Sequence, residues 1–190
     1  VLISRAYPNL RSLDVSGCRS LQNDAITLLG SQCRSLTALS VAQCYLLTDF
    51  GFRTLNNTTL TSLDVSGTDV NGAFAANMLG KGSVLSTLNV SSCKRIFGQL
   101  VNSIPAVNNI RSLNMNRTTL TKVMWLKLCK LLPNVRSISS VNCACVTDEV
   151  VQEFILQHPA LKYFYVKDCK VTPETINMYR CLRVEETDRD

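Results

Sequence analysis

Residues 10–18 read Leu10-Arg11-Ser12-Leu13-Asp14-Val15-Ser16-Gly17-Cys18. Leu13 and Val15 alternate with polar residues, and this period of two is typical of a short β-strand with one buried and one exposed face. The pattern of three spaced apolar residues followed by Cys or Thr recurs along the chain. Its copies are 24 to 26 residues apart and begin at Leu10, Leu36, Leu60, Leu85, Ile110, Val135 and Leu161. A repeat of this length predicts a solenoid of stacked coils whose function lies on an extended surface.

The repeat organises the whole chain, 1–190, into a single domain. We expect 1–9 to be the end of an upstream repeat, so that the chain is part of a larger protein. The predicted repeats are then 10–35, 36–59, 60–84, 85–109, 110–134, 135–160 and 161–184, followed by a polar, acidic tail at 185–190.

Each repeat is predicted to hold a strand and a return helix. Stacked strands would pair as a parallel sheet, and bulkier helices on the outside would make the sheet concave. Thr48, Thr147 and Thr172 are expected helix N-caps, and Pro173 suits the first helical position. The fold class is therefore α/β, a solenoid of about seven repeats with helices on its convex side.

One column of the repeat holds only Cys or Thr. A thiol and a hydroxyl are both small and able to form hydrogen bonds, so the column predicts a ladder of compact, buried polar groups. Its members are Cys18, Cys44, Thr68, Cys93, Thr118, Cys143 and Cys169. Cysteines in this arrangement are expected to be reduced, which predicts an intracellular protein of the cytoplasm or nucleus.

Bulk composition excludes several classes. No apolar run approaches the roughly 18 residues of a transmembrane helix, so we expect no membrane span. The net charge is +6, from 20 basic and 14 acidic residues. Because the basic residues do not form a cluster with interleaved aromatics, and because Asp14 and Asp64 would face a phosphate backbone, no nucleic-acid partner is predicted.

The chain resembles the cysteine-containing leucine-rich repeats of F-box leucine-rich-repeat proteins and of the related spindle-exit antagonist family. The resemblance lies in residues 8–18, in Leu47-Thr48-Asp49 with the residues up to Leu55, and in Val146-Thr147-Asp148. It implies a right-handed β-α superhelix that holds a protein partner, and it raises the possibility of a ubiquitin ligase adaptor. No F-box segment precedes the repeats in this sequence.

The residues do not form a recognisable catalytic or metal site. His158 is the only histidine and ends a predicted helix, where a polar helix-end role is expected. Cys143-Ala144-Cys145 would need two further ligands to bind zinc. We predict no enzyme activity and no cofactor. Cys33, Cys129, Cys181 and Trp125 are interpreted as core residues, and the sequons at Asn56, Asn89 and Asn116 as coincidental.

The concave face is the expected binding surface. Most of its predicted outward positions are small and polar, but its C-terminal end gathers Tyr163, Tyr165 and Lys167, with Arg136 and Lys162 at the rim. Tyr and Arg are favoured at interface hot spots. We therefore predict that a protein partner binds Tyr163, Tyr165, Lys167, Arg136, Lys162, Asn114 and Asn116. The alternative for the tyrosines is packing between strands.

Three other functions remain open from the residues. The chain could be the substrate-recognition region of an F-box type adaptor, which the resemblance implies. It could regulate a small GTPase, for which Arg117 is the residue to test, although a period near 25 disfavours this role. It could also act in extracellular recognition, but the paired cysteines of disulfide-bonded caps do not flank the repeats.

Overall fold

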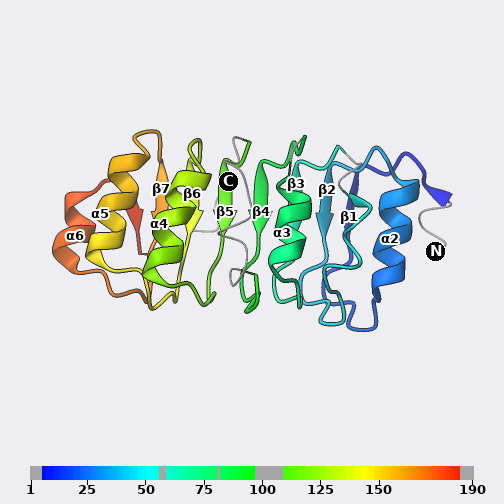
Figure 1. Ribbon diagram of the computed structural model, residues 1–190, viewed down its shortest axis with the longest axis horizontal. Helices are drawn as coiled ribbons and strands as arrows, with labels where there is room; N and C mark the ends of the chain where they lie inside the picture. The colour runs from blue at the N-terminus through cyan, green and yellow to red at the C-terminus, as the bar shows by residue number, and fades with distance from the viewer. Residues whose placement is uncertain (1–5, 56–58, 81, 97–108, 185–190) are drawn as a thin grey trace.

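The strands of the computed structural model form one parallel sheet in strict chain order (Figure 1). The structure describes residues 6–55, 59–80, 82–96 and 109–184. The strands are β1 (Ser12–Asp14), β2 (Ala38–Ser40), β3 (Ser62–Asp64), β4 (Thr87–Asn89), β5 (Ser112–Asn114), β6 (Ser137–Ser139), β7 (Tyr163–Tyr165) and β8 (Leu182–Arg183). The predicted α/β solenoid with a parallel sheet is confirmed. The short β8 beside β7 adds a strand to the seven that the repeat predicts.

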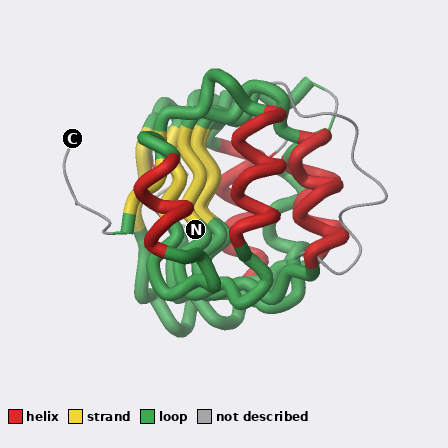
Figure 2. Tube along the Cα trace, turned by 90° about the vertical axis from the view of Figure 1, so that its left-hand side faces the viewer, coloured by secondary structure: helices red, strands yellow, loops and turns green. Residues whose placement is uncertain are grey.

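Helices cover one side of this sheet, and Figure 2 shows the strands as one layer with the longer helices on the other side of the molecule. They are α2 (Asn23–Gln32), α3 (Gly72–Met78), α4 (Lys122–Leu131), α5 (Asp148–Gln157) and α6 (Pro173–Met178). None of these described helices is long and apolar enough to cross a bilayer. The other face of the sheet, which we call the open face, carries the side chains that alternate with the buried strand residues.

The expected N-caps differ in how they act. Thr172 precedes Pro173 of α6 and accepts a hydrogen bond from the backbone N–H of Thr175. Thr147 occupies the N-cap position of α5 but makes no side-chain capping bond. Thr121, which the sequence analysis did not single out, caps α4 by accepting from the N–H of Met124.

The prediction of an α-helix after Thr48 is wrong for the described residues 49–55: residues 49–54 form turns and Leu55 has 3₁₀ geometry. Only 24 residues separate Leu36 from Leu60, and Gly51, a poor helix former, lies within the returning segment. Phe52 and Leu55 are nevertheless fully buried. The apolar stripe therefore packs against the sheet without an α-helix to carry it.

A single continuous core runs between the sheet and the returning segments. Each strand from β2 to β7 places its central residue in this core. Towards the C-terminal end, the aromatic rings of Trp125, Phe154 and Phe164 pack together, with centroids 5.3 to 5.7 Å apart. Trp125 is fully buried, so its role is packing.

The first coil is less buried than the others. Leu10, Leu13 and Val15 are half-buried, whereas their equivalents in the second coil are buried. Ala6 and Tyr7 lie at this end beside an open hollow of about 400 Å³. The remaining residues of the predicted upstream repeat, 1–5, and the predicted acidic tail, 185–190, lie outside the described residues. So does much of the return segment of the fourth repeat, 97–108.

Candidate functional site

Strand register sets which side chains meet on the open face. Ser137 pairs with Tyr163 and Ser139 with Tyr165 across β6 and β7, and Tyr165 then pairs with Arg183 of β8. Because alternate strand residues point to the same face, Tyr163 and Tyr165 both project from the open face. Their rings stack with centroids 6.3 Å apart.

Arg183 completes this group, which we call the tyrosine patch: Tyr163, Tyr165 and Arg183. The Arg183 guanidinium lies 5.5 Å from the centroid of the Tyr163 ring, within the range of a cation–π interaction. It also donates to the carbonyl oxygens of Arg180 and Leu182, which fix its position. Tyr163 keeps 43% of its surface exposed. Sequence reasoning missed Arg183 because the repeat pattern predicts one strand in the seventh repeat, 161–184, and β8 is a second strand at the end of that repeat.

The other predicted partner-binding residues fall into two groups. Arg136, Lys162 and Lys167 are exposed around the tyrosine patch. Asn114 and Asn116 are half-buried and belong to a chain of side-chain hydrogen bonds across the open face. Partner binding by all of these residues stays a prediction.

That chain of hydrogen bonds links β3 to β6. Asn89 donates to Asp64 Oδ2 at 2.8 Å. The Ser91 hydroxyl donates to Asn114 Oδ1 at 2.7 Å, and the Ser139 hydroxyl donates to Asn116 Oδ1 at 2.7 Å. Side-chain hydrogen bonds thus connect neighbouring coils across the polar middle of the open face, and Asn114 and Asn116 accept two of them.

The last residue of β1, β3, β4 and β5 closes the turn that follows its strand. The side-chain oxygens of Asp14, Asp64, Asn89 and Asn114 accept from the backbone N–H two residues later. The side-chain and backbone hydrogen bonds from Ser16 lower the pKa of Asp14. Asp and Asn recurring in one column are the signature of such Asx turns, and this signal in the sequence could have revealed them.

The Cys and Thr column lies along one line through the solenoid. Cys44, Thr68, Cys93, Thr118 and Cys143 are buried, Cys169 is half-buried, and Cys18 is exposed because it belongs to the end coil. The thiols of Cys44, Cys93 and Cys143 donate to carbonyl oxygens of the preceding coil, those of Val15, Val65 and Met115. Cys169 likewise donates to the Ser140 carbonyl at 3.0 Å.

Burial keeps the thiols of Cys44, Cys93 and Cys169 in the donating form. It raises the pKa of Cys44 above its usual range, and that of both Cys93 and Cys169 to about 11. A sulfur in a disulfide has no hydrogen to donate, so these four bonds require reduced cysteines. All the cysteines whose side chains the structure describes are free; Cys129 is not among them.

The comparisons with known proteins agree with this geometry. A leucine-rich-repeat family model matches residues 8–30 and 56–73. A chain of the crystal structure of the Rad7 and Elc1 complex in yeast is similar in structure, with a TM-score of 0.65 and 22% identity over 86% of this chain and 44% of that chain. The chain folds as a leucine-rich-repeat solenoid.

Two other solved structures are also similar to this chain. The leucine-rich-repeat-containing protein LegL7 from Legionella pneumophila has a TM-score of 0.56 and 17% identity, over 84% of this chain and 57% of LegL7. A chain of the TLR13–ssRNA13 complex has a TM-score of 0.56 and 14% identity, over 95% of this chain and 29% of that chain. The chain thus spans about half the length of the Rad7–Elc1 chain and of LegL7. Curated protein sequences include no match.

The leucine-rich-repeat solenoid uses its one histidine for packing. His158 is buried and stacks on Phe154 with ring centroids 4.1 Å apart. Its Nδ1 lies 2.8 Å from the Phe154 carbonyl oxygen and its Nε2 lies 3.1 Å from that of Leu132. These contacts join α5 to the preceding coil and leave neither ring nitrogen facing solvent.

The other chemical candidates also have structural contacts. Cys143 of the Cys143-Ala144-Cys145 pair belongs to the ladder, and no group of three or more metal-binding side chains occurs among the described residues. The amides of the sequons at Asn89 and Asn116 take part in the hydrogen bonds of the open face, and Asn56 lies outside the described residues. Cys33 is buried, and Cys181 is half-buried.

A column of left-handed residues precedes the ladder in all seven repeats, and sequence reasoning missed it. The φ angles lie between +56° and +75° at Gly17, Gln43, Gly67, Ser92, Arg117, Asn142 and Asp168. Gly, Asn and Asp at four of these positions were the available signal. Arg117, the residue proposed for GTPase regulation, is exposed at this turn, where its backbone N–H donates to the Val141 carbonyl.

Proposed function

We propose that this leucine-rich-repeat solenoid is a non-enzymatic module that binds a protein partner on its open face, at the tyrosine patch. Solenoids of this fold are typical interaction scaffolds. The observation that carries the proposal is the stacked pair Tyr163 and Tyr165, with Tyr163 43% exposed and Arg183 against its ring. Packing between strands alone would bury both rings, whereas this arrangement presents rigid aromatic surface beside a fixed cation.

The surroundings of the patch support a protein partner. Elsewhere the described open face is small and polar, and much of its hydrogen-bonding capacity is used by the chain from Asp64 to Ser139. Lys162, Lys167 and Arg136 are exposed around the tyrosines. An aromatic centre within a charged rim is the usual anatomy of a protein interface.

The test is a double variant with a matched control. Tyr163→Ala with Tyr165→Ala should abolish capture of the partners that the unchanged protein retains in affinity purification. The control, Tyr7→Ala with Tyr45→Ala, removes two tyrosines that lie away from the patch and are more exposed, at 62% and 52%. This control variant should still capture the same partners. Urea midpoints must first show that both variants fold. Equal capture by all three proteins would contradict the proposal.

A narrower role is the substrate-recognition region of an F-box type ubiquitin ligase adaptor. The resemblance of the repeats favours it, and a structural relative is crystallised in a complex with Elc1. Co-purification of the full-length protein with a Skp-type adaptor would support this role. Purification with substrates but without any such adaptor would restrict the module to plain scaffolding.

We also propose an intracellular location, in the cytoplasm or nucleus, because the ladder needs reduced thiols. Thiol titration of the denatured protein without reductant should yield about nine free thiols, the full cysteine content. A value lower by two or more would indicate disulfides and an oxidising compartment.

A further inference from the structure

A row of cations marks the edge of the sheet from which β5–β8 start. Arg111, Arg136 and Lys162 each directly precede a strand, and strand register places Arg180 at the equivalent position beside β8. The backbone N–H of Arg136 donates to the Arg111 carbonyl and that of Lys162 to the Arg136 carbonyl, so these residues are direct neighbours. All four are exposed. We call Arg111, Arg136, Lys162 and Arg180 the cation row.

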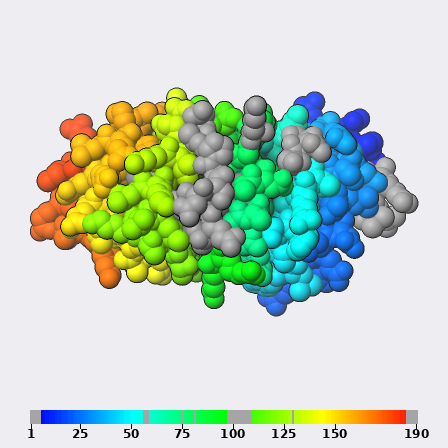
Figure 3. All heavy atoms as spheres, in the orientation of Figure 1, coloured from blue at the N-terminus to red at the C-terminus, as the bar shows by residue number. Residues whose placement is uncertain are grey.

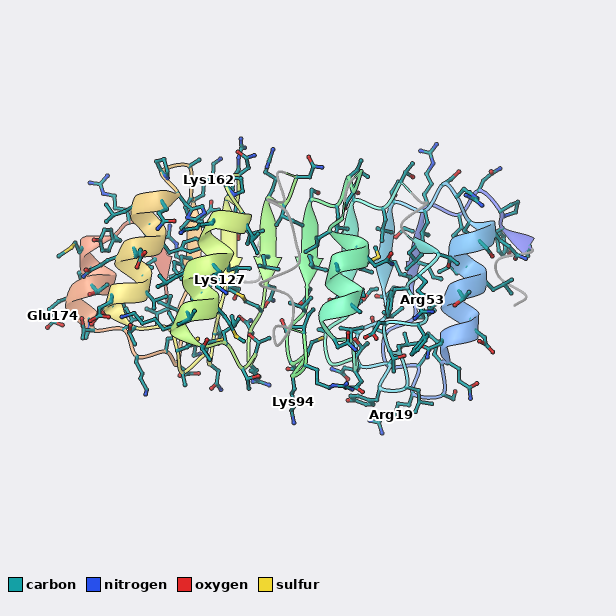
Figure 4. The ribbon with its side chains drawn as sticks, viewed as in Figure 1. Arg19, Arg53, Lys94, Lys127, Lys162 and Glu174 are labelled. Atoms are coloured by element: carbon teal, nitrogen blue, oxygen red, sulfur yellow. The ribbon has the colours of Figure 1, made fainter. Side chains whose placement is uncertain are left out.

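Carboxylates lie at the opposite edge. Every described Asp or Glu except Glu153 lies between the last residue of a strand and the first turn of the segment that follows it: Asp14, Asp24, Asp49, Asp64, Asp69, Asp148, Glu149, Asp168 and Glu174. Figure 4 shows Lys162 at one edge of the sheet and Lys94 and Arg19 at the other. Cations thus lie at both edges, whereas almost all of the described carboxylates lie at the edge opposite the cation row.

The described carboxylates therefore lie away from the cation row, in which the Arg111 guanidinium donates to the Asn134 carbonyl oxygen. The ion pairs of the described residues join Arg95 to Asp69 and Lys122 to Glu149, away from the row. Residues 70–147 contain nine Lys or Arg and no Asp or Glu, a segregation that the overall composition conceals. Like charges about 4.8 Å apart repel one another, so the row favours an anionic partner.

Helix dipoles do not explain the row. Helices α4 and α5 end towards this edge, and their carbonyl ends attract cations. That attraction acts within the last turn, where Lys130 already lies. Arg136 and Lys162 follow the helices in the connections to β6 and β7, outside the last turn.

We infer that the cation row binds an acidic helix of the protein partner, an inference that rests on the proposed function and names the chemistry of that partner. Helix residues three and four apart have Cβ atoms about 5–6 Å apart, close to the strand spacing of about 4.8 Å. Glutamates at i, i+4, i+7 and i+11 span about 16 Å, and the four cations about 14 Å. One carboxylate can therefore face each cation, with the tyrosine patch alongside.

A nucleic-acid strand fits this surface less well. Single strands bind where phosphate-tracking cations lie beside aromatic faces that are free to stack on bases. Beside the row, Tyr163 is flanked by Tyr165 and by the Arg183 guanidinium. Stacking a base there would require these contacts to break.

The probe is a labelled 20-residue helical peptide with Glu at i, i+4, i+7 and i+11, and its matched control has Gln at these positions. Fluorescence anisotropy with the full chain should show binding of the Glu peptide that weakens as salt is added, and at least tenfold weaker binding of the Gln peptide. Arg136→Gln with Lys162→Gln should weaken Glu-peptide binding about 2- to 25-fold. The control, Arg19→Gln with Lys94→Gln, removes the same amount of charge from the opposite edge. It should change the affinity for the Glu peptide less than twofold.

Several results would overturn the inference. Equal losses in the two double variants would show non-specific attraction to net charge. Equal binding of the Glu and Gln peptides would show that the charge of the peptide does not determine binding. Tighter binding of a single-stranded RNA of 20 nucleotides that depends on Arg136 and Lys162 would assign the row to nucleic acid.

The proposed function can be judged separately. If Arg136→Gln with Lys162→Gln captures the partner normally while Tyr163→Ala with Tyr165→Ala does not, the module stands and the acidic-helix inference fails. If neither pair changes partner capture, the proposed function itself fails.

Discussion

Cys and Thr serve the ladder in two different ways. The Cys93 thiol reaches back to the Val65 carbonyl of the preceding coil at 3.1 Å, whereas the Thr68 hydroxyl donates to the same carbonyl from within its own coil at 2.6 Å. The longer bond from carbon to sulfur gives the thiol its reach. A thiol therefore ties two coils together, while a hydroxyl closes a turn within one coil.

This difference gives a test at Cys44, which is fully buried and donates to Val15. Cys44→Asp places an unpaired charge in the core and should lower the free energy of unfolding by about 3–5 kcal/mol. Cys44→Thr keeps a buried donor and loses only the tie between coils, which should cost about 1 kcal/mol. Urea denaturation measures both. Equal midpoints for the Asp variant and the unchanged protein would contradict a buried ladder.

At Gly17 the backbone conformation, and not side-chain packing, determines the cost of a substitution. Its φ is +75°, and an added Cβ would have no atom within 4 Å. Gly17→Ala should therefore cost about 1 kcal/mol through conformational strain alone. Gly17→Asn should cost less, because Asn adopts the left-handed region more readily. Urea midpoints that place Ala at or above Asn would show that this turn does not require the left-handed conformation.

At the scale of elements, hydrogen bonds tie the start of three return segments to the next coil. The side chain of Asn23 accepts from the backbone N–H of Thr48, Asp49 from that of Asn71 and Asp148 from that of Thr172. Asn23 and Asp148 are the first residues of α2 and α5, and Asp49 occupies the equivalent position in the second coil, which has no α-helix there. These acceptors explain why Asp follows Thr in Leu47-Thr48-Asp49 and Val146-Thr147-Asp148.

Asp148 offers a pH-dependent test of these ties. The backbone N–H of Thr172, followed by hydroxyl donors, lowers the pKa of the Asp148 carboxyl. A lowered pKa in the folded state means that the stabilisation is present above the unfolded pKa of about 3.9 and is lost as the pH falls through the folded value. Asp148→Asn keeps a side-chain acceptor, the group that Asn23 uses for the same bond in the first coil. The urea midpoint of this variant should be close to that of the parent at pH 7 and should fall less than that of the parent on acidification.

Urea midpoints at pH 7, 5 and 3 compare this variant with the parent, and Glu153→Gln, a carboxylate change on the same helix, is the control. Asp148→Ala removes the acceptor and should lower the midpoint already at pH 7. Identical acid sensitivity in the parent and in Asp148→Asn would show that the carboxylate of Asp148 is not responsible.

At the scale of the whole molecule, the repeat predicted the stacking order because Leu, Val and Cys recur at fixed distances and each must enter the same core. The residues could not reveal the left-handed column fully, since Gln43, Ser92 and Arg117 accept that conformation at a modest cost. The turns after Thr48 escaped prediction because Phe52 and Leu55 have a helical spacing that also packs without a helix. Arg111, Arg136 and Lys162 share the repeat position after the first apolar residue, which is why the sequence placed Arg136 and Lys162 at the rim. Arg180 and Arg183 join them only because β8 pairs with β7, and no local pattern indicates that pairing.

Figure 3 shows coils that follow one another along the long axis, so each coil touches only its neighbours. Among the described residues, the first coil packs against one neighbouring coil and the fifth against two, so in the chain 1–190 opening the first coil breaks fewer contacts. The amides of Val15 and Gly17 donate to carbonyls of the second coil at 2.9 and 2.7 Å, and those of Met115 and Arg117 make the equivalent bonds at 2.8 and 2.9 Å. Because these hydrogen bonds have similar lengths, the number of interfaces that must open should determine the rate of amide hydrogen exchange. We expect amide hydrogen exchange at Val15 and Gly17 to be at least about tenfold faster than at Met115 and Arg117. Equal protection would mean that the coils open as one cooperative unit, in which case a ligand on the open face would stabilise the first coil as much as the fifth.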